Sequence, residues 1–362
     1  MCSDFKTAYD TIITGLTNVT KQQVPKGADV IIFGYGSMGR GLAKAARDLD
    51  INVIAFFDNN YQGMCEVENI PVVVPGSIKC EPSCFVYIAT MIEQFQSEMK
   101  AQLQALGVAE SQIIERVTLH ECTPKVFEDE HFSGYESTYD VLADEKSKQV
   151  LLQRVQSYFQ PHQFEHDAFS EQYFDLGIMQ LGQGDVFVDA GCFDGETSLA
   201  FIERAGQNYG YIYAFEPDPD NQRLCDANLA TTPRIGLVKK GLSEAEQTLF
   251  FKAMGTGSST VDEQGQISID VISLDAFLEG KQHQPTFIKM DIEGSELAAL
   301  RGAEQTIRKH KPKLAICVYH KIEDVYAIPE LIQSYGEYTF YMRHYTPFQT
   351  ETVLYALPKK EF

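Results

Sequence analysis

The 362-residue sequence is poor in basic residues and has no long apolar run, and each absence excludes a class of function. Lys and Arg together number 30 against 51 Asp and Glu, which gives a formal charge of −21. Binding to nucleic acid or to an anionic membrane surface needs clustered basic side chains, so we expect neither partner. No segment approaches the ~18 consecutive apolar residues of a membrane-spanning helix. The opening MCSDFK lacks the basic-then-apolar order of a signal peptide, which favours a cytoplasmic protein.

The sequence also lacks a second close pair of cysteines. Its eight cysteines are spread along the chain, several within apolar runs, and we interpret them as reduced core thiols. Cys80 and Cys84 are four residues apart, with Cys65 upstream, but a zinc site needs a fourth ligand that no second pair supplies. We therefore predict no metal centre among the cysteines.

The order of apolar runs, glycine turns and helical patterns predicts an α/β protein of two Rossmann-like units. The length fits two domains at ~100–200 residues each, and no internal repeat is present. Strands alternating with helices indicate parallel sheets with crossover helices. The last two strands have no helix between them and must form an antiparallel hairpin. We expect a small N-terminal parallel-sheet domain, an acidic helical connector and a C-terminal sheet, over residues 1–122, 123–178 and 179–362.

The first glycine-rich loop has a nucleotide-binding pattern. Gly34, Gly36 and Gly39 form GxGxxG between an apolar strand and a predicted helix at 40–49, and Asp58 ends the next strand. Backbone N–H groups at the helix start would hold phosphate, and Asp58 would accept from ribose hydroxyls. The alternative is a turn that needs glycine only for close packing of strand and helix. A full dinucleotide site needs two such halves, and this domain is too short for both.

Three short segments after this loop form a recognisable pattern. They include FDNN at 57–60, Gly63 and IPV at 70–72. This stretch resembles the small Rossmann-like domain that precedes bacterial sugar-modifying transferases. The resemblance implies a nucleotide or nucleotide-sugar ligand for the N-terminal domain.

The second glycine-rich loop, VDAGCFDGET at 188–197, follows a strongly apolar strand and opens a helix. Glu216 ends the next strand, where an acid suits the ribose of an adenosine. Acidic side chains flank the loop, and they would repel a diphosphate: Asp189, Asp194 and Glu196. S-adenosylmethionine, which is cationic and has no phosphate, matches this charge.

The second loop and the segments after it resemble class I methyltransferases, in particular the FkbM family. The segments are FEPD at 215–218, ISLD at 272–275, FIKMDIEGSEL at 287–297, LRGA at 300–303, KP at 311–312 and YH at 319–320. The resemblance covers about half the chain. It implies a methyltransferase that binds S-adenosylmethionine and methylates a hydroxyl. The cofactor residues that it implies are Asp189, Gly191, Phe193, Asp194, Gly195 and Glu216, although Phe193 stands where the general pattern has glycine.

Charged residues follow two further strands of the predicted sheet. Ligands in open α/β sheets lie at the carboxyl ends of the strands, so Asp291, Glu293 and His320 should border one cleft. His320 is the first candidate for a general base, with Asp291 or Glu293 as rivals. Lys289 could stabilise an oxyanion or simply pair with an acid. Structural alternatives are a hydrogen-bonded histidine and carboxylates that cap the next helix.

Magnesium held by Asp291, Glu293 and His320 is a further alternative, and we predict no metal. The acceptor is expected to be a small molecule or a glycan with a sugar hydroxyl. Two rival functions stay open. One is a nicotinamide oxidoreductase that uses the Gly34 loop, and the other is a non-catalytic protein that binds nucleotide sugar and S-adenosylmethionine.

Overall fold

The computed structural model describes the chain in the segments 4–16, 24–25, 27–35, 39, 42–43, 51–60, 63–64, 70–90, 93–114, 122–159, 163–175, 177–252, 260–261 and 267–359. The chain divides into two compact units. One unit holds residues 15–119, and the other combines residues 1–14 with residues 120–253 and 257–362. None of the described helices is long and apolar enough to cross a membrane.

The unit 15–119 is built on a six-stranded sheet in the order β3-β4-β2-β1-β5-β6. Its strand pairs are parallel except β3 with β4. Apolar side chains on both faces of β1 are buried, as expected for a strand inside a parallel sheet. The strands are β1 (Asp29–Phe33), β2 (Asn52–Phe57), β3 (Gly63–Met64), β4 (Pro71–Val73), β5 (Phe85–Ile88) and β6 (Ile113–Ile114), and the helices are α3 (Glu93–Ala105) and the short η1 (Glu110–Gln112). The helix predicted at 40–49 lies mostly outside the described residues.

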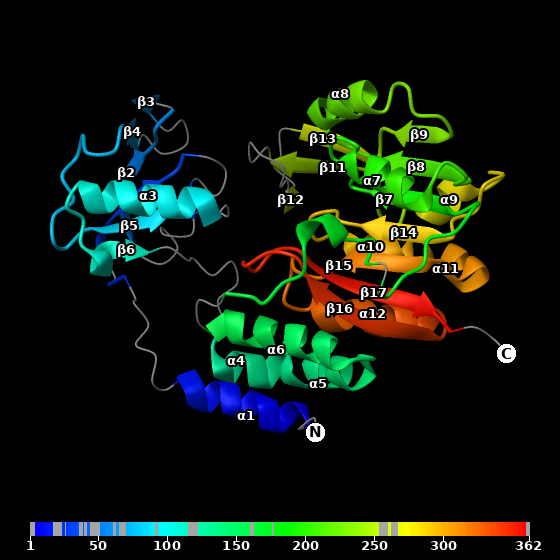
Figure 1. Cartoon of the computed structure of the whole chain (residues 1–362), viewed down its shortest axis with the longest axis horizontal. Coiled ribbons are helices and arrows are strands. Elements are labelled where there is room, and N and C mark those ends of the chain that lie inside the picture. Colours follow the sequence, from blue (N-terminus) through cyan, green and yellow to red (C-terminus); the bar gives the residue numbers. More distant parts are fainter. Residues whose placement is uncertain are drawn as a thin grey trace. The chain divides into compact units, whose positions relative to one another are not determined.

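The second unit contains a seven-stranded sheet in the order β16-β17-β15-β14-β7-β8-β9 (Figure 1). Strands β15, β14, β7, β8 and β9 are parallel, and β17 runs antiparallel to both β15 and β16. The fold class and the terminal hairpin predicted from the sequence are therefore confirmed. The strands are β7 (Val186–Ala190), β8 (Tyr211–Phe215), β9 (Ile235–Val238), β14 (Phe287–Met290), β15 (Lys313–Cys317), β16 (Tyr338–His344) and β17 (Thr352–Pro358).

Helices connect these strands and a smaller sheet extends the unit. The helices are α7 (Glu196–Ala205), α8 (Pro219–Asn228), α9 (Leu274–Leu278), α10 (Glu296–Arg301), α11 (Glu304–His310) and α12 (Asp324–Tyr335). The smaller sheet, in the order β10-β13-β11-β12, was not predicted; its strands are β10 (Gly241–Leu242), β11 (Gln247–Lys252), β12 (Thr260–Val261) and β13 (Ile267–Ile272).

The apolar spacing of residues 295–310 predicts one continuous helix, and the structure interrupts it. It forms α10 and α11, with the break at Gly302. A Cβ at Gly302 would lie 2.1 Å from the carbonyl oxygen of Ser243, so the chain there passes close to a distant segment. The Asp275 carboxylate accepts from the backbone N–H groups of Gln305 and Thr306 and so caps the new helix. The interruption is thus caused by tertiary packing.

The acidic connector forms α4 (Pro124–Glu130), α5 (Phe132–Val141) and α6 (Glu145–Phe159) beside the β16 end of the sheet (Figure 1). The first helix, α1 (Phe5–Leu16), packs on them through aromatic rings. Phe5 lies 5.2 Å from Phe132 between ring centroids, and Tyr9 stacks on Phe127 at 5.5 Å. The α1 helix thus belongs to the second unit, whereas the sequence grouped it with the first glycine loop.

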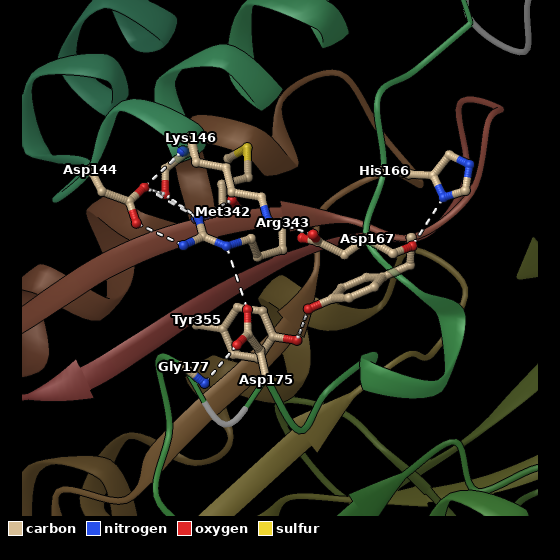
Figure 2. A network of polar contacts seen from close by, with 11 residues as sticks. Asp144, Lys146, His166, Asp167, Asp175, Gly177, Met342, Arg343 and Tyr355 are labelled. Atoms are coloured by element: carbon tan, nitrogen blue, oxygen red, sulfur yellow. Dashed lines mark hydrogen bonds and ion pairs between the residues drawn. The ribbon is translucent and has the colours of Figure 1, made fainter.

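A buried arginine fastens the connector and the following loop to the sheet (Figure 2). Arg343 on β16 donates to Asp144 Oδ2 at 2.7 Å, and its Nε lies 3.5 Å from Asp175 Oδ2. Burial acts to raise the pKa of Asp144, but hydrogen bonds from Arg343 and Ser147 outweigh it and lower that pKa to about 2. The loop 163–175 is thereby held where it enters the sheet edge.

Candidate functional site

At two positions, the loop between β7 and α7 has a left-handed backbone conformation that glycine adopts easily and other residues do not. Gly191 has φ 75° and Gly195 has φ 90°. A Cβ at Gly191 would lie 1.9 Å from the carbonyl oxygen of Asp291, so β7 and β14 approach each other closely here. Asp194 accepts the N–H of Glu196 at the start of α7. The loop predicted from the sequence therefore exists and lies at the carboxyl edge of the sheet.

Glu216 lies directly after β8 and faces this loop. Its Oε2 accepts the N–H of Phe193 and its Oε1 accepts the N–H of Asp218, each at 2.9 Å. Burial raises the pKa of Glu216, although these hydrogen bonds act in the opposite direction. The carboxylate is thus fixed at the loop, with lone pairs left for a ligand's hydroxyl groups.

Asp189 and Lys289 form a buried ion pair below the loop, with Lys289 Nζ 3.1 Å from Asp189 Oδ1. Ser198 donates to the other oxygen of Asp189 at 2.8 Å. Lys289 also donates to the carbonyl of Gly191 at 2.7 Å. Burial alone would lower the pKa of Lys289, but Asp189 and Asp291 raise it above its usual value. Lys289 is therefore a fixed cation that ties β14 to the loop.

Asp291 follows β14 and is held by two tyrosines. Tyr173 donates to Oδ2 at 2.7 Å, and Tyr319 donates to Oδ1 at 3.1 Å. Burial acts to raise the pKa of Asp291, yet the charges of Lys289 and His320 keep it below its usual value. Asp291 is therefore an oriented carboxylate whose oxygens already accept hydrogen bonds.

His320 follows β15 and lies among carboxylates. Its Nδ1 is 3.2 Å from Glu296, and its Nε2 is 3.5 Å from Asp291 and 3.6 Å from Glu293. Burial would lower the pKa of His320, but these acids outweigh it and raise the pKa to about 9. The imidazole is therefore protonated at neutral pH.

Glu293 is the most accessible acid next to His320, with its side chain 38% exposed. Burial raises its pKa to about 7, with His320 opposing and Asp291 adding to the shift. Its backbone is in the left-handed region at φ 56°. A carboxyl group with this pKa exchanges its proton near neutral pH.

The sequence did not identify four other residues of this cluster. Glu296 is fully buried against His320, and Glu351, just before β17, has its pKa raised to about 7 by burial and by Asp291. Tyr173 and Tyr319 hold Asp291. Glu296 and Tyr319 lie within quoted motif segments, so a signal existed for them. Tyr173 and Glu351 come from the connector and the hairpin, where no motif marks them.

Backbone strain concentrates at the His320 cluster and the neighbouring glycine loop. Six non-glycine residues in the described part of the chain have positive φ, and four of them belong here: Tyr173, Phe193, Glu293 and Glu351, at φ 66°, 54°, 56° and 68°. Such conformations cost of order 1–3 kcal/mol each and gather at functional sites. This distribution marks the carboxyl edge of the second sheet as the candidate site.

A metal ion was an alternative for part of the cluster. Asp291, Glu296 and His320 each place one ligand atom within 4.8 Å of the others. Both nitrogens of His320 face carboxylates, however, and a ring in that position fits a protonated imidazole, which has no lone pair for a metal. As arranged, these three residues do not fit a bound metal ion.

The first glycine loop also has a defined geometry in its described residues. Gly34 has φ 110°, and a Cβ at Gly39 would lie 1.9 Å from the carbonyl oxygen of Gly34. The Asp58 carboxylate accepts the N–H of Tyr35 at 2.9 Å. The third predicted position, Gly36, lies outside the described residues.

Known proteins resemble the chain in two ways. Residues 186–345 match the family model of the Methyltransferase FkbM domain. A 138-residue stretch is 29% identical to the hexuronic acid methyltransferase AglP of Haloferax volcanii, and it covers 37% of this chain and 56% of that protein. The chain thus spans little more than half the length of this curated relative.

A solved structure shows the same fold over nearly the whole chain. It is the crystal structure of Methyltransferase FkbM from Methylobacillus flagellatus KT, with a TM-score of 0.69 and 22% sequence identity. The likeness covers 97% of this chain and 98% of the other.

Proposed function

We propose that the chain transfers a methyl group from S-adenosylmethionine to a hydroxyl group, because residues 186–345 match the family model of the Methyltransferase FkbM domain. The acceptor contains a sugar and is a glycan, a nucleotide sugar or a related natural product. The printed activity of AglP, a hexuronic acid methyltransferase, supports a sugar acceptor. The observation that carries the proposal is the fixed Glu216 carboxylate facing a glycine loop, with a cluster of ionisable side chains after the neighbouring strands.

The sheet order divides the proposed site into two halves. The Gly191 loop and Glu216 follow β7 and β8, and they would hold the cofactor through its ribose hydroxyls and its amino acid part. Asp291 and His320 follow β14 and β15, on the other side of β7, and Glu351 precedes the adjacent β17. This half would bind the acceptor. The Asp189–Lys289 pair keeps the loop between the halves in place.

When bound, S-adenosylmethionine supplies a methyl group on a sulfonium sulfur, which passes to the acceptor oxygen as the carbon–sulfur bond breaks. The chain must align the hydroxyl and take its proton. Glu293 is the base in this proposal, because its pKa of about 7 leaves it partly ionised at neutral pH and its side chain reaches solvent. His320, the first candidate from the sequence, would act as the cation that keeps these carboxylates together.

The test combines cofactor binding with methyl transfer. Calorimetry should detect binding of S-adenosylmethionine to the full chain, and Glu216→Gln should weaken it by about 100-fold, since hydrogen bonds to a charged group contribute ~1.5–3 kcal/mol. Glu337→Gln is a matched control, because Glu337 is exposed and precedes β16 at the opposite edge of the sheet. If the unmodified chain does not bind the cofactor, the proposal is wrong.

The N-terminal unit supports a separate proposal, that its loop binds a nucleotide or the nucleotide part of a sugar donor. The close approach of Gly34 and Gly39 and the Asp58 carboxylate at the end of β2 support it. Uridine diphosphate glucose is a suitable probe for calorimetry. Loss of its binding in Asp58→Ala, with S-adenosylmethionine binding unchanged, would support this site, and binding of NAD(H) in its place would favour the oxidoreductase.

A further inference from the structure

The acceptor half of the proposed site is strongly acidic. Its carboxylates are Asp291, Glu293, Glu296, Asp324 and Glu351, and its cations are His320 and Lys289. Lys289 is already paired with the buried Asp189. Two cations, one of them already paired, thus face five carboxyl groups in this set.

Several of these acids repel one another. Burial raises the pKa of Glu293, Glu351 and Asp324 to about 7 each, and neighbouring carboxylates add to each shift. Above this pH the three groups lose their protons, and their negative charges repel those of the neighbouring carboxylates. A ligand that brings positive charge or hydrogen-bond donors would relieve this repulsion, and an anionic ligand would increase it.

Two buried oxygens of the cluster also lack a hydrogen-bond donor among the described residues. Glu296 is fully buried, and its Oε2 has no partner although Oε1 accepts the N–H of Ile292. Asp324 is 1% exposed, and its Oδ1 is equally without a partner. A buried acceptor without a donor is costly, so these atoms point to a ligand or water that donates.

The rim offers little to an anion. Lys321 is the basic residue beside the cluster, and its ammonium group donates to the carbonyl of Gly294. Its backbone N–H donates to Asp324. A carboxylate or phosphate in the acceptor half would therefore lie close to the carboxyl groups of Glu293 and Glu351, and the ammonium group of Lys321 already donates to a backbone carbonyl.

We propose that the sugar unit that receives the methyl group carries no carboxylate or phosphate of its own and is an uncharged polyol or an amino sugar. This inference rests on the proposed function and concerns the acceptor half alone. It sets the chain apart from AglP, whose printed activity is on a hexuronic acid. Repulsion between like charges is an effective way to reject such an analogue, because it costs several kcal/mol at close contact.

The experiment compares three methyl glycosides that share one ring and differ in charge: methyl glucoside, methyl glucosaminide and methyl glucuronide. Binding to the full chain saturated with S-adenosylhomocysteine is measured by calorimetry at pH 8, where the carboxyl groups are ionised. We expect the glucuronide to bind at least 10-fold more weakly than the other two. Glu293→Gln should reduce this difference in affinity several-fold. Glu337→Gln, at the opposite sheet edge, should leave the difference unchanged.

Two results would overturn the inference. One is tightest binding by the glucuronide, and the other is no binding by the glucoside and the glucosaminide. Failure of the proposed function is recognised separately, because the chain would then not bind S-adenosylhomocysteine in the first step. A glucuronide preference that Lys321→Ala abolishes would identify Lys321 as an anion site and contradict the inference directly.

Discussion

The two glycine loops of this chain use the same hydrogen-bond scheme. In the first unit, the N–H of Gly34 donates to the carbonyl of Phe57 at 2.7 Å. Asp58, the next residue, accepts the N–H of Tyr35 at 2.9 Å and the N–H of Asn60 at 2.8 Å. The loop and the end of the neighbouring strand are thus joined through one carboxylate.

In the second unit, the N–H of Gly191 donates to the carbonyl of Phe215 at 3.0 Å. Glu216 then accepts the N–H groups of Phe193 and Asp218, each at 2.9 Å. The two loops therefore differ in sequence and agree in how an acid at the second strand organises them.

The units differ in what surrounds the loop. In the first unit, the buried polar side chains among the described residues are Gln96 and Gln112, which carry no charge, and β5 is followed by Ala89 and Thr90. In the second unit, the strand in the corresponding place, β14, is followed by Asp291 and Glu293. The two units therefore share the loop hydrogen bonds and differ in their buried charges, and the proposed reaction depends on the charges that only the second unit has among the described residues.

The largest expected effect tests whether the charged strand ends carry the reaction. Glu293→Gln should lower kcat by about 10²–10⁴-fold, because the variant cannot take the proton of the acceptor hydroxyl. Its affinity for S-adenosylmethionine should stay within a few-fold, since the cofactor half is untouched. Steady-state kinetics and calorimetry measure the two quantities. A near-normal kcat in this variant would show that Glu293 is not the base and would favour His320 in that role.

The pH dependence of kcat also tests whether Glu293 or His320 is the base. Glu293 has a pKa of about 7 and His320 a pKa of about 9. The rate should rise as the pH passes 7, where Glu293 loses its proton, and fall above about 9, where His320 loses its charge. Because the groups interact, the two limbs belong to the cluster as a whole. With His320 as the base, activity would instead increase up to pH 9 and persist above it.

The features that could be predicted from the sequence are those whose residues are close in the chain. Asp189, Gly191, Gly195 and Glu216 lie in a strand-loop-helix-strand segment, where spacing alone fixes the geometry. Tyr173 reaches Asp291 across 118 positions, and only tertiary packing brings them together. The break at Gly302 likewise depends on Ser243, which belongs to a different segment.

Charge state was the other property that the sequence could not supply. The type and position of His320 suggested a base with an ordinary pKa. The shift to about 9 arises because Glu296 and Asp291 approach it from opposite sides of the ring. Glu296 is the first residue of α10, and its sequence position alone gives no sign that it faces His320.

The buried charges around Arg343 also predict how the stability of the second unit responds to mutation and to pH. Arg343→Met should lower the free energy of unfolding of the second unit by ~3–5 kcal/mol, because it removes the cation that Asp144 and Asp175 share. Arg343→Lys should lower the free energy of unfolding by a smaller amount, because lysine keeps the positive charge. The pKa of Asp144 is lowered to about 2, so its contribution is present above pH 3.8 and is lost as the pH falls through 2. Urea unfolding followed by circular dichroism measures both effects, and a loss below ~1 kcal/mol in Arg343→Met would mean that the network adds little.

The smallest expected effect concerns strain, which also separates the two loops. Each non-glycine residue with positive φ in the described part of the chain lies in the second unit. Phe193 holds φ 54° with its side chain 49% exposed, a costly combination for an aromatic residue. Asn adopts this conformation more readily, so Phe193→Asn should stabilise the second unit by up to about 1 kcal/mol while it weakens S-adenosylmethionine binding. Leu224→Asn is the matched control, since Leu224 is 48% exposed within α8 of the same unit and Asn is a poorer helix former. Denaturation midpoints compare the two variants. If Phe193→Asn is no more stable than the control, or binds the cofactor normally, the strained backbone of this loop is not maintained for ligand binding.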